Sequence, residues 1–143
     1  MKPLQPVLRT SDNWGLLILR LGVALAIFPH GAQKVLGWWG GMGFSKTLEV
    51  FAEKMEIPSG LTVLAMAAEF LGPMGLALGL LTRLSALGIA ITMGVAVSMH
   101  ASSGFFAGNG GFEYPLTLCI AALALVVSGG GKWSADRALA KAA

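Results

Sequence analysis

Three ionisable side chains interrupt an apolar stretch near the start of the chain and could do acid–base chemistry there. Arg20, His30 and Lys34 lie within RLGVALAIFPHGAQK (residues 20–34), which is otherwise apolar enough for a lipid bilayer. Ionisable groups are costly at membrane depth, so they commonly face a bundle interior or a wet cavity and mark a functional site. Because His30 and Lys34 are four residues apart, they share one face of a helix. The stretch therefore predicts two nitrogen bases near one membrane surface.

Further acidic and histidine side chains belong to the later apolar segments. Glu69 lies near the middle of the second segment, while His100 and Glu113 border a glycine-rich loop at residues 101–111. In a four-helix arrangement, His30, Lys34, His100 and Glu113 would converge in the outer half of the membrane. Glu69 is a candidate proton-carrying carboxylate, because burial and a nearby cation shift the pKa of a carboxyl group in opposite directions.

Each of these residues also has a purely structural interpretation. Arg20 and Glu69 could form an ion pair that fixes helix register, because a lone buried charge is far costlier than a paired one. His100 and Glu113 could clamp the glycine-rich loop, and His30 could bond loop carbonyls at the interface.

A lipid-soluble quinone, or another flat molecule with polar tips, would suit such a group of residues. It needs an apolar slot, donors to its carbonyl oxygens and a proton path, and histidine and glutamate could supply the last two. We predict His30 and Glu69 as catalytic residues that handle protons. A phenylalanine pair in the 101–111 loop could cover the slot, although loop phenylalanines also anchor proteins in membranes. The predicted substrate-binding residues are Arg20, Lys34, His100, Phe105, Phe106 and Glu113.

The chain carries no group that stores electrons. It has one cysteine, Cys119, and neither a dinucleotide-binding glycine fingerprint nor a haem-attachment motif. Any redox activity must therefore use a quinone, a bound cofactor or a partner protein. His30 and His100 leave haem or a metal ion as less favoured alternatives, because few further ligands accompany them. Cys119 lies among alanines and leucines, where a free thiol is usually inert.

Composition identifies the class of protein. Apolar residues make up 55% of the 143 residues, charged residues only 12%, and the mean hydropathy is +0.74. Residues 84–112 and 114–131 contain no Asp, Glu, Lys or Arg, which argues against a soluble helical protein. Basic and aromatic residues are not interleaved as in nucleic-acid-binding proteins.

The expected fold is an all-α integral membrane protein, a four-transmembrane-helix bundle forming a single membrane domain over residues 1–143. Residues 44–55 alternate apolar and charged positions at helical spacing, and are too short and too charged to span a bilayer. We therefore expect an interfacial amphipathic helix there, between the first two spans. The predicted spans are residues 13–34, 59–80, 83–100 and 112–128.

The distribution of basic residues predicts orientation. Four spans place both termini and the 81–83 turn on one side of the membrane. That side has six basic residues: Lys2, Arg9, Arg83, Lys132, Arg137 and Lys141. The other side has three: Lys34, Lys46 and Lys54. Basic residues favour the cytoplasmic side. We expect a multi-pass protein of the bacterial inner membrane with both termini in the cytoplasm. No small-residue cleavage site follows the first apolar run, so that run is expected to be a retained span. Small-residue stripes on the helices would serve a homo-oligomer as well as packing within one chain.

Several motifs resemble the DoxX family of small four-helix bacterial membrane proteins. They are LRLG around Arg20, HGAQK at residues 30–34, AEFLGPMGLALGLLTRLSAL at residues 68–87, GGFEYPL at residues 110–116 and GGGKWSAD at residues 129–136. Their order and spacing cover most of the chain, from about residue 19 to residue 136.

The resemblance implies a membrane oxidoreductase or a subunit of one, since members are linked to thiosulfate–quinone oxidoreduction, to catechol or quinone reduction, or to complexes that recruit detoxifying enzymes. The leading hypothesis is a quinone-linked oxidoreductase, or a membrane subunit of one, with an ionisable cavity open toward the outer leaflet. One alternative is a non-catalytic membrane anchor or assembly subunit for soluble redox enzymes. Another is a binding or transport protein for a small apolar ligand.

Overall fold

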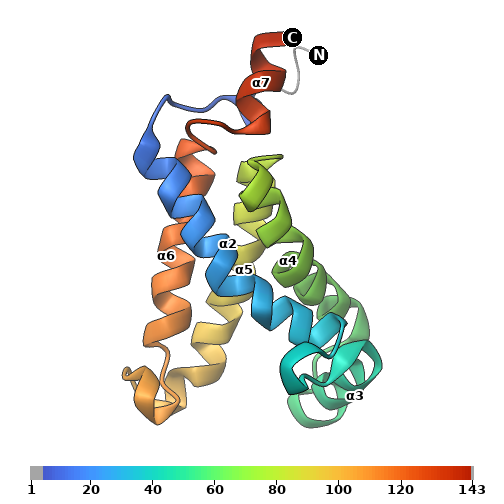
Figure 1. Cartoon of the computed structure of the whole chain (residues 1–143). Coiled ribbons are helices and arrows are strands. Elements are labelled where there is room, and N and C mark those ends of the chain that lie inside the picture. The colour runs from blue at the N-terminus through green and yellow to red at the C-terminus, as the bar shows by residue number, and fades with distance from the viewer. Residues whose placement is uncertain (1–4, 143) are drawn as a thin grey trace.

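The computed structural model describes residues 5–142, which are helical apart from short connections (Figure 1). Five helices begin and end within two residues of the predicted ranges, whereas α1 and α7 were not predicted. Short 3-10 turns lie at Trp38–Gly40, Ala101–Ser103 and Ala107–Asn109. The helices are α1 (Gln5–Leu8), α2 (Trp14–Val35), α3 (Gly43–Met55), α4 (Ser59–Leu78), α5 (Thr82–His100), α6 (Glu113–Ser128) and α7 (Ala135–Ala142).

Three helices are long and apolar enough to cross a membrane. They are Trp14–Val35, Ser59–Leu78 and Thr82–Ser103, the last of which continues α5 through the following 3-10 turn. α6 is apolar but has only 16 residues. Their outward faces carry large apolar side chains, for example Leu25, which is 77% exposed, and Val127, which is 75% exposed. Such surfaces require lipid rather than water around the helices, so the chain is a helical membrane protein.

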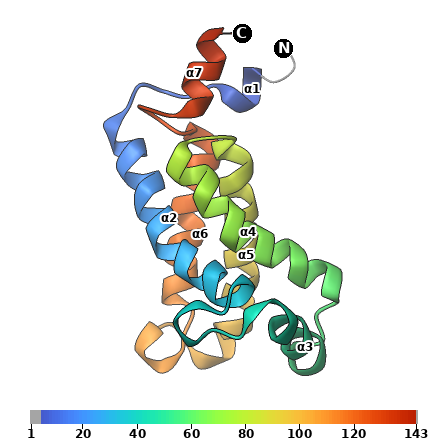
Figure 2. The ribbon, with the colours of Figure 1, turned by 45° about the vertical axis from the view of Figure 1, so that its right-hand side comes forward.

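The four longest helices, α2, α4, α5 and α6, are arranged as two antiparallel pairs. α2 packs along α4, and α5 packs along α6, while the tight turn between α4 and α5 joins the two pairs. Figure 1 shows the pairs close together at the end that carries α7 and both termini, and farther apart at the opposite end. The view in Figure 2 places α1 and α7 at the same end and α3 at the other.

Local signals start and stop these helices. The Asn13 side chain caps α2 by accepting a hydrogen bond from the Gly15 N–H at 2.6 Å. Gly79 ends α4 in the left-handed conformation at φ 66°, which favours glycine. α5 is capped from far along the chain, because the buried Asp136 carboxylate accepts from the N–H groups of Leu81 and Thr82 at 2.7 and 2.8 Å.

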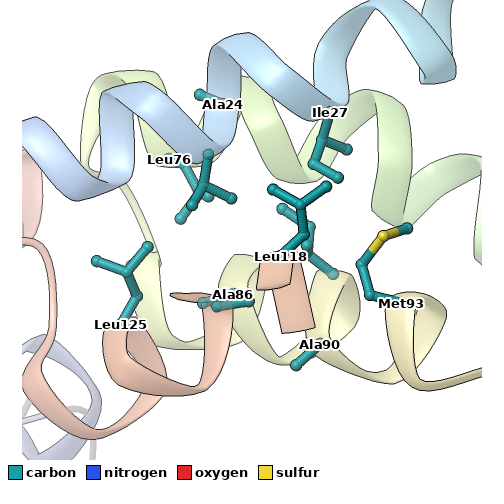
Figure 3. Close-up of a cluster of buried hydrophobic side chains, with 11 residues drawn as sticks. Ala24, Ile27, Leu76, Ala86, Ala90, Met93, Leu118 and Leu125 are labelled. Carbon is teal, nitrogen blue, oxygen red and sulfur yellow. The ribbon is translucent and has the colours of Figure 1, made fainter. Parts of the chain in front are cut away.

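The hydrophobic core fills the space between the two pairs near the end where they meet (Figure 3). Leu76, Ile89 and Leu125 are fully buried there, each from a different helix. Ile27 and Met93 belong to the same cluster and also line the pocket described below. The core therefore ends where the helix pairs begin to separate.

The exposed Asp12 carboxylate attaches the segment before α2 to α7. Arg137 donates two hydrogen bonds to it, at 2.5 and 2.9 Å. These bonds, with the nearby positive charges, hold the pKa of Asp12 below its ordinary value.

Because that pKa is lowered in the folded protein, the attachment is fully present above the unfolded pKa, about 3.9, and is lost as pH falls through the folded pKa. We expect the contact to be unchanged from pH 7 to pH 5 and to release only in stronger acid. Trp14 fluorescence in protein whose other tryptophans are replaced by phenylalanine measures this, and Asp12→Asn should remove the acid transition. An unchanged transition in Asp12→Asn would assign it to another group.

Candidate functional site

A pocket of about 480 Å³ lies between the two helix pairs, at the end where they separate. Each of the four long helices and the loop before α6 contributes to its wall, and the wall is mostly apolar with a few polar groups. Four of the predicted site residues line it: His30, Lys34, Glu69 and His100. A concave apolar pocket with a small number of convergent polar groups is the usual form of a small-molecule site.

An ion pair between Lys34 and Glu69 joins α2 to α4 in the pocket wall. The Glu69 side chain is only 4% exposed, and that of Lys34 is 26% exposed. The Lys34 ammonium also lies 5.8 Å from the centre of the Phe51 ring. The Thr47 hydroxyl, which donates to the Gly43 carbonyl at 2.7 Å, lies 3.2 Å from the Lys34 carbonyl. α3 therefore covers this pair from outside, which protects it from solvent and keeps the lysine directed into the bundle.

The backbones of α2 and α4 touch where this pair is formed. A Cβ atom on Gly31 would overlap the carbonyl group of Glu69, so only glycine allows this crossing. Pro73 has no N–H and cannot complete the helical bond to that same carbonyl. The close crossing and the proline together place Glu69 beside the end of α2, within reach of Lys34.

His30 faces a tyrosine that the sequence reasoning did not single out. The ring centres of His30 and Tyr114 are 6.0 Å apart, and both residues are exposed and line the pocket. The Tyr114 hydroxyl donates to the Ala26 carbonyl at 3.4 Å and so connects α6 with α2. Tyr114 is the only tyrosine in the chain and lies in the GGFEYPL motif. That motif was the one feature of the sequence that could have identified it as a pocket residue.

His100 and Glu113 do not form the predicted clamp. His100 directs Nδ1 at the Ala96 carbonyl, 2.8 Å away. Since a carbonyl can only accept, Nδ1 carries a proton and Nε2 is left to accept or donate elsewhere. Glu113 instead accepts from the Ala107 N–H at 3.0 Å. The carboxylate thus closes the glycine-rich loop through a backbone contact, and Ala107 in that loop lines the pocket.

The two loop phenylalanines lie beside the pocket wall, outside its lining. Phe105 and Phe106 stack edge to face at 5.4 Å, and Phe105 packs on Phe112 at 5.6 Å. Both loop rings remain exposed, by 47% and 66%. The structure thus shows an exposed aromatic cluster at this end of the bundle. That the two loop phenylalanines cover the pocket stays a prediction.

Arg20 lies at the opposite end of the bundle from the pocket, and the alternative of an Arg20–Glu69 ion pair is wrong, because Glu69 pairs with Lys34. Ten residues of helix separate Arg20 from His30, which is roughly 15 Å. The guanidinium is 1% exposed and donates to five backbone carbonyls. Its acceptors are Leu76 and Ala77 at 2.7 Å, Gly130 and Trp133 at 2.9 Å, and Lys132 at 3.3 Å.

Five carbonyl acceptors use every N–H donor that a guanidinium has. Arg20 therefore joins α2 to the end of α4 and to the segment before α7, and it serves the fold at that place.

The remaining candidate ligands are dispersed. Cys119 is half-buried between α5 and α6, with its sulfur 3.4 Å from the Ala90 carbonyl. Within residues 5–142, no three histidine, cysteine or acidic side chains come close enough together to hold a metal ion. The groups available to a ligand in the pocket are thus two imidazoles, the Lys34–Glu69 pair and one phenol.

Comparison with known proteins identifies the family. The DoxX family model matches residues 15–106, a segment that contains His30, Lys34, Glu69 and His100 and stops before α6. A protein of Haemophilus influenzae, described as an uncharacterized protein, is 36% identical over 129 residues, covering 88% of this chain and 83% of that protein. No solved structure matches the chain. The family match covers more than half of the sequence and agrees with the all-helical membrane architecture, and the chain therefore belongs to the DoxX family.

Proposed function

We propose that this protein binds a lipophilic quinone in the pocket between the helix pairs and acts as the membrane subunit of a quinone-linked oxidoreductase. The observation that supports the proposal is the common lining of one apolar pocket by His30, His100 and the Lys34–Glu69 pair. The pocket volume of about 480 Å³ is within the usual range for small-molecule sites. It would hold a quinone ring and the first part of an apolar tail.

The residues of the pocket would supply binding and protons. When bound, a quinone takes up two electrons from a partner redox enzyme, together with two protons. His30 would donate a hydrogen bond to one carbonyl oxygen and deliver a proton to it. The Lys34–Glu69 pair would then restore that proton, because Lys34 donates a hydrogen bond to the Glu69 carboxylate and both groups line the same pocket. His100, when both of its ring nitrogens are protonated, would hold the second oxygen through Nε2 and deliver the second proton to it.

The same proposal includes the full topology. α6 at 16 residues extends about 24 Å and would form a fourth, shorter span, while α3 would lie in the interface plane. The excess of basic residues at the end with the termini favours a cytoplasmic position for both. The protein would then lie in the inner membrane with the pocket open toward the outer leaflet.

Two substitutions test the role of the pocket. His30→Leu should weaken quinone binding about tenfold, because it removes the donor of one hydrogen bond of about 1.4 kcal/mol. Glu69→Gln should lower quinone-dependent turnover by about 100-fold or more, because proton transfer is lost. Binding is measured with purified protein in lipid nanodiscs, and turnover is measured in membranes that contain the partner enzyme.

Glu53→Gln on α3 is the matched control, since Glu53 is exposed and does not line the pocket. It should leave binding and turnover unchanged. Normal quinone binding and turnover in both pocket variants would contradict the proposal. If a soluble enzyme copurifies in fixed ratio with both pocket variants and keeps its activity, the protein would instead be a membrane anchor for that enzyme.

A further inference from the structure

A second pocket, of about 430 Å³, lies at the end of the bundle opposite the candidate quinone site. α7, the segment before it and the segment before α2 form its walls. Among the described residues 5–142, three cationic side chains line it with one carboxylate: Lys132, Arg137 and Lys141 with Asp12. The lining therefore carries an excess of two positive charges.

Contacts within the pocket fix two of these cations. Arg137 is held by two hydrogen bonds to Asp12, and the Lys132 ammonium lies 3.9 Å from the same carboxylate. Lys132 also lies over the Trp14 ring, at 4.6 Å from its centre, a favourable position for a cation. Arg137 and Lys132 are thus held beside one carboxylate, which neutralises only one of their two positive charges.

Two tryptophans place this pocket at the level of the lipid headgroups. Trp133 lines the pocket and is 75% exposed, and its ring contacts that of Trp14 at 4.9 Å. Trp14 is also the first residue of α2, so the apolar surface of that helix begins here. Tryptophan is enriched where the hydrocarbon core meets the headgroups.

We propose that this pocket binds the phosphate group of an anionic phospholipid, with Lys132 and Lys141 as its main contacts and Trp133 against the glycerol and upper acyl chain. The charge excess, the level of the pocket and the exposed indole favour a lipid over a soluble anion. A free phosphate would contact only the cationic side chains, whereas the glycerol and acyl chain of a lipid would also contact the Trp133 ring. The site is independent of the proposed quinone function.

Tryptophan fluorescence tests the proposal directly. The chain has four tryptophans, and Trp38→Phe with Trp39→Phe leaves only the two beside this pocket. The full-length protein in this background is placed in vesicles that contain a trace of spin-labelled phosphatidylglycerol or spin-labelled phosphatidylcholine. We expect the spin-labelled phosphatidylglycerol to quench the tryptophan fluorescence at a severalfold lower mole fraction than the spin-labelled phosphatidylcholine. Each basic residue near a membrane surface raises the affinity for anionic lipid about fivefold.

Matched charge changes give the controls. Lys132→Gln with Lys141→Gln should abolish the preference for the anionic lipid, while Lys54→Gln at the other end of the bundle should leave it intact. Asp12→Asn should increase the preference, a gain that a misfolded variant would not show. Equal quenching by the two lipids in the parent protein, or a preference that survives the double lysine substitution, would overturn the proposal. Relief of quenching by millimolar inorganic phosphate would also overturn it, because the site would then be one for soluble anions.

Discussion

Replacing Arg20 with glutamine is expected to lower the free energy of unfolding by at least about 3 kcal/mol. The guanidinium is buried and donates to five carbonyls, three of them in the segment before α7. An amide has only two N–H donors, so several buried carbonyls would lose their partners. Unfolding in a graded mixture of mild and denaturing detergents, followed by circular dichroism, measures the change.

Two comparisons separate geometry from charge at this position. Arg20→Lys keeps the positive charge but loses the planar fork of donors, so it should cost about 2 kcal/mol. Arg83→Gln is the control, because the half-buried Arg83 also donates to carbonyls, those of Arg9, Val126 and Val127, and all of these contacts except the one to Val126 are exposed. That variant should change stability by less than about 1 kcal/mol. Full stability in Arg20→Lys would mean that charge alone matters there.

Replacing Gly31 with alanine should disrupt both the helix crossing and the candidate quinone site. The new methyl group would overlap the Glu69 carbonyl, a backbone atom that cannot turn away. α2 and α4 must then move apart, which is expected to cost about 1–3 kcal/mol. The same movement separates Lys34 from Glu69, so quinone binding should fall along with stability.

Gly22 provides the control on the same helix. A Cβ atom there meets nothing within 4 Å, and alanine is the better helix former by about 1 kcal/mol. Gly22→Ala should therefore preserve or slightly raise stability and leave ligand binding unchanged. Detergent unfolding and nanodisc binding, measured on both variants, make the comparison. Equal behaviour of the two variants would show that the crossing tolerates a side chain.

Most of the helical architecture could be predicted from the sequence. Apolar runs of sufficient length predicted α2, α4 and α5, and alternating charged positions predicted α3. α7 was not predicted, because its role depends on a contact with no local signal. Asp136 caps a helix that begins 54 residues earlier in the chain, and only the folded structure brings the two together.

The candidate site was predicted in its members but not in their pairing. His30, Lys34 and Glu69 were selected because ionisable groups are rare in such segments. Arg20 was considered as the partner of Glu69 because both residues lie near the middle of their helices. That inference did not include the length of the side chains. Lysine and arginine extend over several ångströms toward the best available partner. Lys34 therefore reaches Glu69, and Arg20 reaches the end of α4 and the segment before α7.

The contacts of Arg20 have a consequence for biosynthesis. Its carbonyl acceptor Gly130 follows 110 residues later, and at about 5–20 residues per second a ribosome needs roughly 5 to 20 s to add them. Throughout that interval the guanidinium in the nascent first helix lacks at least three of its five final acceptors, the carbonyls of Gly130, Lys132 and Trp133. The helix must keep this group among water and lipid headgroups, and it can settle at its final depth only after residues 130–133 have been translated.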